Sequence, residues 1–489
     1  MTDAQFINWL QSASAIRCVL VEAVASVAGV ETLRYLSSAN YVTGAADAPA
    51  NIAYLPVISG GVSISESLSI DGSAAMSFGD IELSNMGELD SWLNDVWTNR
   101  SVNIFVGDVR WPRADFRQVF AGTLAGISSR SRTTLNLALR DKLQRLNTPM
   151  TDAKLGGTTT NKDSVLPLCF GECNNIEPLL INPDTLQYQV HDGPIERIIE
   201  VRDNGMPVGF TATLASGTFV LTQQPFGTVT CSVQGDKFGG AYRNTIGALV
   251  QRLVAGYGKS TDRFTSGDLD ATNLTAFEAA HTQPVGLYVP SRENVLQCCA
   301  SLASSVGAQL VMSRTGLLRL LKIALPAVGP ATTVTKMQMA AQSLSVTDRP
   351  EVQAAVKIGY CKNHTVQANL LTGIPEAHKA LFAEEWLTTT STDAPTATAY
   401  RLTAEPEQID TLLLAAATAA AEATRRLALW KTQRTVYSYT GTPALMLEAL
   451  GGAQTMTHAR YGLAAGVTGQ IVGLNQDWLA GRVQIEVLA

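Results

Sequence analysis

Apolar and polar residues alternate with a period of two through much of the first 147 residues, the pattern of a strand with one buried face. The segment 60–85 shows this alternation most clearly, at Val62, Ile64, Leu68 and Ile70. Similar runs, separated by glycine, asparagine and aspartate, predict further strands at 101–108, 117–129 and 133–141. Residues 1–147 are therefore predicted to form an N-terminal β domain.

One segment of this region departs from the alternation. Between residues 87 and 97, the apolar side chains fall on one helical face: Leu89, Trp92, Leu93 and Val96. We therefore expect a short helix inserted between the strands.

Residues 148–238 follow a polar, glycine- and threonine-rich loop with strands and turns at short intervals. The pair Asn204-Gly205, after Asp203, tolerates a positive φ angle and favours a tight hairpin turn. This region is predicted to be a small all-β module.

Residues 239–330 change to a helical period. In the segment 244–258, Asn244 is a candidate helix cap, Gly256 a candidate stop, and the apolar positions share a face (Ile246, Leu249, Val250, Leu253 and Val254). A second helix is expected from Ser291 to about Val306, followed by two strands joined at Arg314-Thr315-Gly316. The region is predicted to be a compact α+β insert.

Residues 331–489 begin with β-like segments, and a threonine-rich loop is expected after Trp386. A long helix is predicted from Glu407 to about Trp430, with Pro406 near its first turn. The closing segments predict three more strands, at 434–441, 466–475 and 481–489. The whole chain is thus expected to be mainly β and multi-domain, with β-barrel or β-sandwich domains, a small α+β insert and one long helix near the C-terminus.

Composition narrows the class of protein. With 46% hydrophobic and 16% charged residues, the chain is neither disordered nor a highly charged surface binder. Its net charge of −6 argues against a nucleic-acid grip, which normally needs a basic face. The amino terminus lacks the pattern of a signal peptide, and Glu422 interrupts the Ala-rich stretch that starts at Leu412, so no membrane span is expected.

Cysteine and histidine spacing does not predict a metal site. Seven cysteines at scattered positions fit reduced thiols in a cytoplasm. Cys169 and Cys173 form a Cys-x3-Cys pair and Cys298 adjoins Cys299, with Cys231 and Cys361 as conceivable distant ligands. Adjacent cysteines on a helix diverge by about 100°, so at least one is expected to be a core residue. None of the five histidines has a second one within metal-ligand spacing.

Motifs for catalysis are equally weak. Gly258-Lys259-Ser260 resembles the end of a phosphate-binding loop, but Leu253 stands where that loop needs glycine, which favours a solvated turn. Asp80 and Glu82 share one face of a predicted strand and favour a solvated edge. We therefore predict a protein that is not an enzyme, with no catalytic, cofactor-binding or metal-binding residues and no cofactor. A hydrolytic site built from residues distant in the sequence remains open.

The most distinctive stretch is 107–122, where aromatic residues interleave with arginines: Trp111, Phe116 and Phe120 with Arg110, Arg113 and Arg117. Such mixtures are typical of protein interfaces and of packed cores, and they occur in single-strand nucleic-acid sites. Asp108 and Asp115 dilute the positive charge, which favours an interface or core packing.

Several segments resemble tail proteins of long-tailed, siphovirus-like bacteriophages. The resemblance lies in TLRYLSSANYVT, in the block with Asp80-Ile81-Glu82-Leu83 that ends at Gly107-Asp108, in WPRADFRQVFAGTLAGISS and in YQVHDGPIERIIEVRDNGMPV. The closing segment, with Arg460-Tyr461-Gly462 and then Gly469-Gln470-Ile471-Val472-Gly473, resembles the last β-barrel segment of baseplate hub proteins. About half of the chain is covered, mostly its two ends.

This resemblance implies a structural baseplate hub subunit at the tail tip of a virion, assembled in the host cytoplasm. Such subunits form a ring, commonly a homotrimer, that joins the tail tube and distal tail protein to the tip and fibres. The ring surrounds the channel for the tape measure protein and for DNA, which only passes through, and no stable membrane insertion is implied. Some tail-tip proteins bind an iron–sulfur cluster, but the cysteines here do not match such a spacing.

Two alternatives stay open. The first is a distal tail ring protein, which would favour sixfold symmetry. The second is a tail-associated hydrolase that acts on the cell wall.

Overall fold

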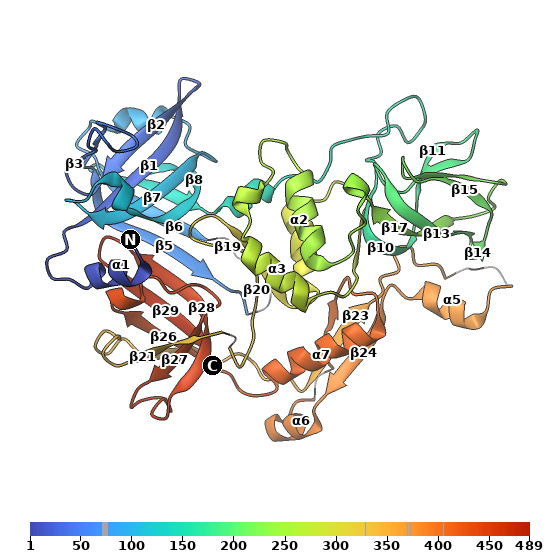
Figure 1. Cartoon of the computed structure of the whole chain (residues 1–489). Helices are drawn as coiled ribbons and strands as arrows, with labels where there is room; N and C mark the ends of the chain where they lie inside the picture. The colour runs from blue at the N-terminus through green and yellow to red at the C-terminus, as the bar shows by residue number, and fades with distance from the viewer. Residues whose placement is uncertain (71–76, 328, 369, 371–372, 404) are drawn as a thin grey trace.

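The computed structural model describes the whole chain except residues 71–76, 328, 369, 371–372 and 404. Within the described residues the protein is mainly β and consists of several sheets, as the sequence predicts. Figure 1 shows the two ends of the chain together on one side, helices in the centre and a separate group of strands on the other side. Residues 71–76 interrupt the predicted strand segment 60–85 and lie outside the description.

The N-terminal strands form a barrel. A small hairpin of β3 (Tyr41–Val42) and β4 (Ala53–Tyr54) lies outside it. The same region also contains four short helices: α1 (Asp3–Leu10), η1 (Asp90–Asn94), η2 (Arg113–Asp115) and η3 (Lys142–Leu146). The barrel strands pair in the order β2 (Val30–Ser37), β1 (Arg17–Val27), β7 (Ser101–Asp108), β8 (Arg117–Ser131), β9 (Thr134–Arg140), β6 (Phe78–Ser84) and β5 (Ile58–Ser67). Leu55, just before β5, closes the barrel against β2. Its N–H donates to the carbonyl of Tyr35, and its carbonyl accepts the N–H of Ser37. We call these strands the N-terminal barrel.

The C-terminal strands form a second barrel. Its strands are β21 (Ala331–Thr335), β27 (Ala453–Thr457), β28 (Val467–Asp477), β29 (Arg482–Leu488), β26 (Val436–Gly441) and β22 (Ser345–Asp348), with the short helix η6 (Pro443–Leu445). β21 pairs with β27, and the same stretch of chain then continues through the Met339–Gly441 bridge into β22, which pairs with β26. One continuous segment therefore closes this C-terminal barrel.

Strand β28 belongs to both barrels. Its first residues pair with β27, whereas Gly473–Asp477 pair with Ser63–Ser67 of β5. The result is one 13-stranded sheet over the described residues. A single hydrophobic cluster contains buried residues of both barrels, such as Ile64 and Ile81 with Ile471 and Ile485, so the barrels share a core.

The middle of the chain makes two further bodies. One is a β module of β10 (Leu168–Ile176), β11 (Leu179–Asn182), β12 (Gln187–Gln189), β13 (Ile195–Asp203), β14 (Met206–Pro207), β15 (Phe210–Thr213), β16 (Thr218–Leu221) and β17 (Val229–Asp236), joined at its edge by β18 (Gly286–Val289). The Asn204-Gly205 turn has positive φ at both residues, of 47° and 83°, and links β13 to β14 as predicted.

The other body is a mixed helical layer (Figure 1). It contains η4 (Phe238–Gly240), α2 (Ile246–Gly256), η5 (Ser266–Asp268), α3 (Ala271–Ala280), α4 (Val295–Ser304) and the hairpin of β19 (Ala308–Met312) and β20 (Leu318–Lys322). Later chain joins it as β23 (Ala355–Tyr360), β24 (Leu387–Thr392), α6 (Ala394–Tyr400), β25 (Gln408–Asp410) and α7 (Ala416–Trp430). Helix α5 (Glu376–Ala383) lies by the β module instead, where the ring of Phe382 packs under Arg202 of β13 (Figure 1). α2, α4 and α7 bury their apolar faces in one shared cluster.

Four local predictions are wrong. The long helix starts at Ala416 and not at Glu407, because residues 408–410 pair with β23 as a strand. The threonine-rich segment after Trp386 is not a loop. Residues 387–392 form β24, since β-branched threonines suit a strand, and Ala394–Tyr400 form α6. Segment 87–97 forms only the 3-10 helix η1, and Leu93 and Val96 are exposed. The cap of α2 is Thr245 and not Asn244.

Candidate functional site

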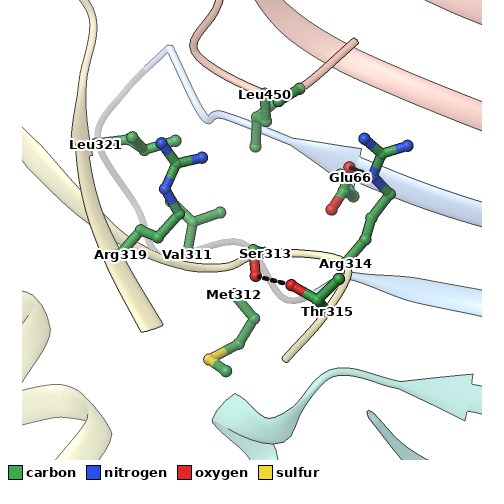
Figure 2. Close-up of a pocket in the computed structure, with 10 residues that line it drawn as sticks. Glu66, Val311, Met312, Ser313, Arg314, Thr315, Arg319, Leu321 and Leu450 are labelled. Carbon is green, nitrogen blue, oxygen red and sulfur yellow. Dashed lines mark hydrogen bonds and ion pairs between the residues drawn. The ribbon is translucent and has the colours of Figure 1, made fainter. Parts of the chain in front are cut away.

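A cavity of about 110 Å³ lies where three distant parts of the chain meet. Glu66 comes from the end of β5, Arg314 and Thr315 from the β19–β20 turn, and Leu450 from the loop after η6 (Figure 2). Glycine is required in this turn, because Gly316 has φ +78° and a Cβ would meet the Ala121 carbonyl at 2.8 Å. The turn thus inserts closely between the two barrels.

Arg314 connects the hairpin to both barrels. Its guanidinium donates to the carbonyls of Met446, Leu447 and Glu448 at 2.9, 3.2 and 2.8 Å. Its own carbonyl accepts the N–H of Ala121, on β8, at 2.7 Å. This one residue therefore binds the N-terminal barrel through its backbone and the C-terminal part through its side chain.

Glu66 is the acid of this junction. Only 5% of its surface is exposed, and its Oε2 lies 3.8 Å from Nε of Arg314. Burial raises the pKa of Glu66, while the guanidinium groups of Arg314 and Arg319 oppose this rise. Burial likewise lowers the pKa of Arg314, with Glu66 opposing. Glu66 and Arg314 line the small cavity together. They form a buried pair of opposite charges where the β19–β20 hairpin meets the two barrels.

A second buried network ties the β module to α2. His191 Nδ1 accepts the backbone N–H of Cys169 at 3.0 Å, and its Nε2 lies 3.5 Å from Asp236. Arg252 of α2 donates to both carboxylate oxygens of Asp236, at 2.9 and 3.1 Å. Burial by itself would raise the pKa of Asp236, but the hydrogen bonds from His191 and Arg252 bring it down to about 2.

Sequence reasoning missed both networks. Glu66 and Arg314 stand 248 positions apart, and no spacing rule connects His191 with Asp236 and Arg252. A local hint existed only for Arg314, which lies in the predicted turn between two strands.

Six of the seven cysteines lie in apolar cores, and Cys361 is half-buried outside them. Cys169, Cys173 and Cys231 lie in the buried cluster of the β module, and Cys298 and Cys299 lie in the helical layer. Burial raises the pKa of Cys231, and the neighbouring Cys173 adds to this rise. Cys361 accepts a hydrogen bond from Asn174 at 3.5 Å. Among the residues that the structure describes, no group of three or more His, Cys, Asp or Glu side chains could hold a metal ion.

The arginine-aromatic stretch packs into the N-terminal barrel, one of the two uses that its composition favours. Phe120 is buried in the main core and Phe116 in a smaller cluster. Arg113 is 9% exposed, pairs with Glu22 at 2.8 Å and lies over the ring of Phe105. Of the remaining members, Arg110 pairs with Asp108 at the end of β7. Arg117 pairs with Asp3 and Trp111 packs on Trp9, so these two contact α1.

Two further sequence candidates have structural partners. Asp80 pairs with Arg130 at 3.1 Å on the half-exposed face of β6, which it shares with Glu82. Lys259 lies exposed in the turn after α2, where its backbone N–H donates to Thr148, and Leu253 is buried inside the helix. The turn interpretation of Gly258–Ser260 is confirmed. In the described part of the chain, every helix is too short or too polar to cross a membrane.

No known protein family matches the sequence, and no curated protein matches it either. Solved structures do resemble the fold over nearly its whole length. A tail protein from Neisseria meningitidis is 10% identical, with 97% of each chain covered and a TM-score of 0.43. A 43 kDa tail protein of prophage MuSo2 from Shewanella oneidensis is 11% identical, with 96% of each chain covered and a TM-score of 0.40.

A third structure, a prophage tail protein from Listeria monocytogenes, is 9% identical, covers 96% of this chain and 94% of its own, and has a TM-score of 0.43. All three are tail proteins.

Proposed function

We propose that this chain is a structural subunit of a bacteriophage tail, which works by assembly and not by catalysis. The observation that carries the proposal is the double pairing of β28, which fuses two closed barrels into one sheet with one core. Separate domains joined only by a linker move relative to each other, whereas shared strands and a shared core hold them rigid. A ring subunit that must keep its shape under mechanical force needs rigidity of this kind.

The finer proposal is a baseplate hub at the tail tip. The segment that resembles hub proteins, with Gly469–Gly473, lies on β28 of the C-terminal barrel. Of the segments that resemble tail proteins in general, Asp80–Leu83 lie on β6 and Gly107 and Asp108 end β7, both in the N-terminal barrel, and residues 188–208 lie in the β module. In this proposal three copies form a ring between the tail tube with its distal tail protein and the tip with its fibres. The ring surrounds the channel for the tape measure protein and the DNA.

The buried polar groups support a structural role. Arg314, Asp236 and His191 each bind groups from other segments of the chain, and each therefore stabilises a contact between parts of the fold. A buried group with perturbed pKa is a candidate for catalysis, but structural ion-pair networks perturb pKa values in the same way.

Native mass spectrometry and electron microscopy of the purified chain test the proposal. We expect a ring of three copies. A sixfold ring would support the distal tail ring alternative, and a persistent monomer would contradict the ring.

The hydrolase alternative has its own test. Purified chain is added to a peptidoglycan suspension, and the turbidity is followed against a lysozyme control. We expect no loss of turbidity above buffer, and a sustained loss would show that the chain is an enzyme.

A further inference from the structure

One groove on the surface has an apolar floor and an acidic rim. It encloses about 620 Å³ between the start of β23, the N-terminal turn of α6 and the chain that enters β25. Five apolar side chains line it: Val356 is buried, Leu402 is exposed, and the others are half-buried (Val352, Ala397 and Ile409). Its lining also includes Glu351, Glu405 and Glu407, all exposed, and within the described residues no lysine, arginine or histidine lines it.

The charge of this rim is largely uncompensated. Asp393, the fourth acid of the groove, caps α6 and pairs with Lys431 at 2.9 Å. In the described part of the chain, no ion pair forms at Glu351, Glu405 or Glu407. The groove therefore favours a segment that brings an apolar or aromatic body together with positive charge.

The loop between β27 and β28 has that composition. Tyr461 is 45% exposed, and the guanidinium of Arg460 lies 5.5 Å from the centre of its ring. Lys336 and His458 line the adjoining cavity of about 420 Å³, to which the described residues contribute no carboxylate. Tyrosine and arginine are the residue types that most often dominate binding energy at interfaces.

The loop is also held in one shape. Tyr461 has φ +57°, a conformation that non-glycine residues rarely adopt, and its carbonyl accepts the hydroxyl of Tyr437 at 3.2 Å. His458 Nδ1 accepts the N–H of Arg460 at 3.1 Å. A loop that is ordered before binding loses less entropy when it docks.

The loop and the groove lie on different parts of one molecule. Figure 1 shows β27 and α6 well apart, with β27 in the C-terminal barrel and α6 below α7 and β24. Contact between them therefore needs two copies. Two different surfaces that meet head to tail make a heterologous interface, and such an interface forms a ring when the rotation between copies closes.

We propose that the Arg460–Tyr461 loop of one copy docks in the acid-rimmed groove of a second copy. This inference rests on the proposed function, because it describes how a tail ring would hold its subunits together. The tyrosine ring lies on the apolar floor, and Arg460 pairs with Glu405 and Glu407 at the rim.

Charge reversal on each side tests the contact. One variant carries Arg460→Glu, and a second carries Glu405→Lys with Glu407→Lys. The control is Arg132→Glu, which makes the same charge change at the exposed tip of the β8–β9 hairpin. Sedimentation velocity at low and high salt should show self-association about tenfold weaker or more in both test variants, while the control associates like the unmodified chain.

Mixing the two variants is the decisive step. Arg460→Glu keeps an intact groove and the double variant keeps an intact loop, so an equimolar mixture should associate more strongly than either variant alone. Tyr461→Ala should weaken association in the same way, since the backbone contact from Tyr437 remains and thermal melting can verify the fold.

Unchanged association of both charge variants, or a mixture that stays monomeric, overturns the inference. Such a result leaves the tail proposal standing if the unmodified chain still forms a ring. If the unmodified chain is monomeric at every concentration, the inference fails together with the proposed ring.

Discussion

Arg314 connects more parts of the fold than any pattern in the sequence suggests. Its guanidinium donates to three consecutive carbonyls in the loop after η6, and Glu66 stands beside it inside the same junction. Burying two charges costs free energy, and their attraction and hydrogen bonds offset that cost only while both partners are present. The junction therefore depends on this pair as a unit.

Replacing Arg314 with Ala should lower the free energy of unfolding by about 3–5 kcal/mol, because it leaves a buried acid without its partner and three carbonyls without a donor. Urea denaturation followed by tryptophan fluorescence measures the loss. The matched control is Arg132→Ala, at an exposed turn, for which about 0.5 kcal/mol or less is expected. Equal stability of the two variants would mean that Arg314 does not hold the junction.

The lowered pKa of Asp236 predicts how the stability of the fold depends on pH. Its pKa is about 2 in the folded protein and 3.8 in the unfolded chain. A carboxylate with a lowered folded pKa stabilises the fold above its unfolded pKa, and this share is lost as the pH falls toward the folded value. The Asp236→Asn variant should therefore be less stable than the unmodified chain at neutral pH, and the gap should narrow between pH 3.8 and about 2.

Denaturation curves of both proteins across that range test the claim, with Asp152→Asn as the control because that carboxylate is largely exposed. A gap that stays constant down to pH 2 would show that Asp236 is not the group that titrates.

At the scale of elements, the seam between β5 and β28 is the critical one. Ser65 pairs with Asn475 on β28 and with Phe78 on β6, so it lies in the middle of the large sheet. Proline there removes a backbone donor and fixes φ. We expect Ser65→Pro to cost about 3 kcal/mol or more in unfolding free energy, whereas Ser65→Ala, which keeps the amide, should cost far less.

Thermal unfolding by circular dichroism compares the two Ser65 variants. A proline variant that melts together with the alanine variant would show that pairing at this seam contributes little to stability.

Local sequence patterns predicted many of the helices, strands and turns. The strand at 101–108 has the predicted bounds, the helix at 244–258 buries the predicted apolar face, and the 314–316 turn joins two strands. These elements follow from alternation, helical spacing and turn residues, all of which act over a few positions. Such rules did not predict the strand at residues 408–410, because these residues form a strand only by pairing with β23, about 50 positions earlier.

Neither the seam nor the candidate site could be predicted. β28 meets β5 across more than 400 positions, and the choice of partner depends on the closure of both barrels. The cavity at Glu66 and Arg314 likewise combines side chains from three distant segments. Only the three-dimensional fold brings these residues together.

For the whole molecule, the shared sheet gives a rigid pair of barrels, to which a helical layer and a β module are attached (Figure 1). The proposed loop and groove lie on separate parts of that body, so each copy can bind one neighbour through its loop and another through its groove. Assembly into a ring is the behaviour that this arrangement favours.

Electron microscopy of phage tails in which this chain carries a tag at its amino terminus tests the central claim most directly, since Met1 is 56% exposed and free to carry a tag. The account predicts extra density as a ring of equivalent positions around the axis at the tail tip. Complete tails without the tag, with the chain left as free single copies in the lysate, would contradict it.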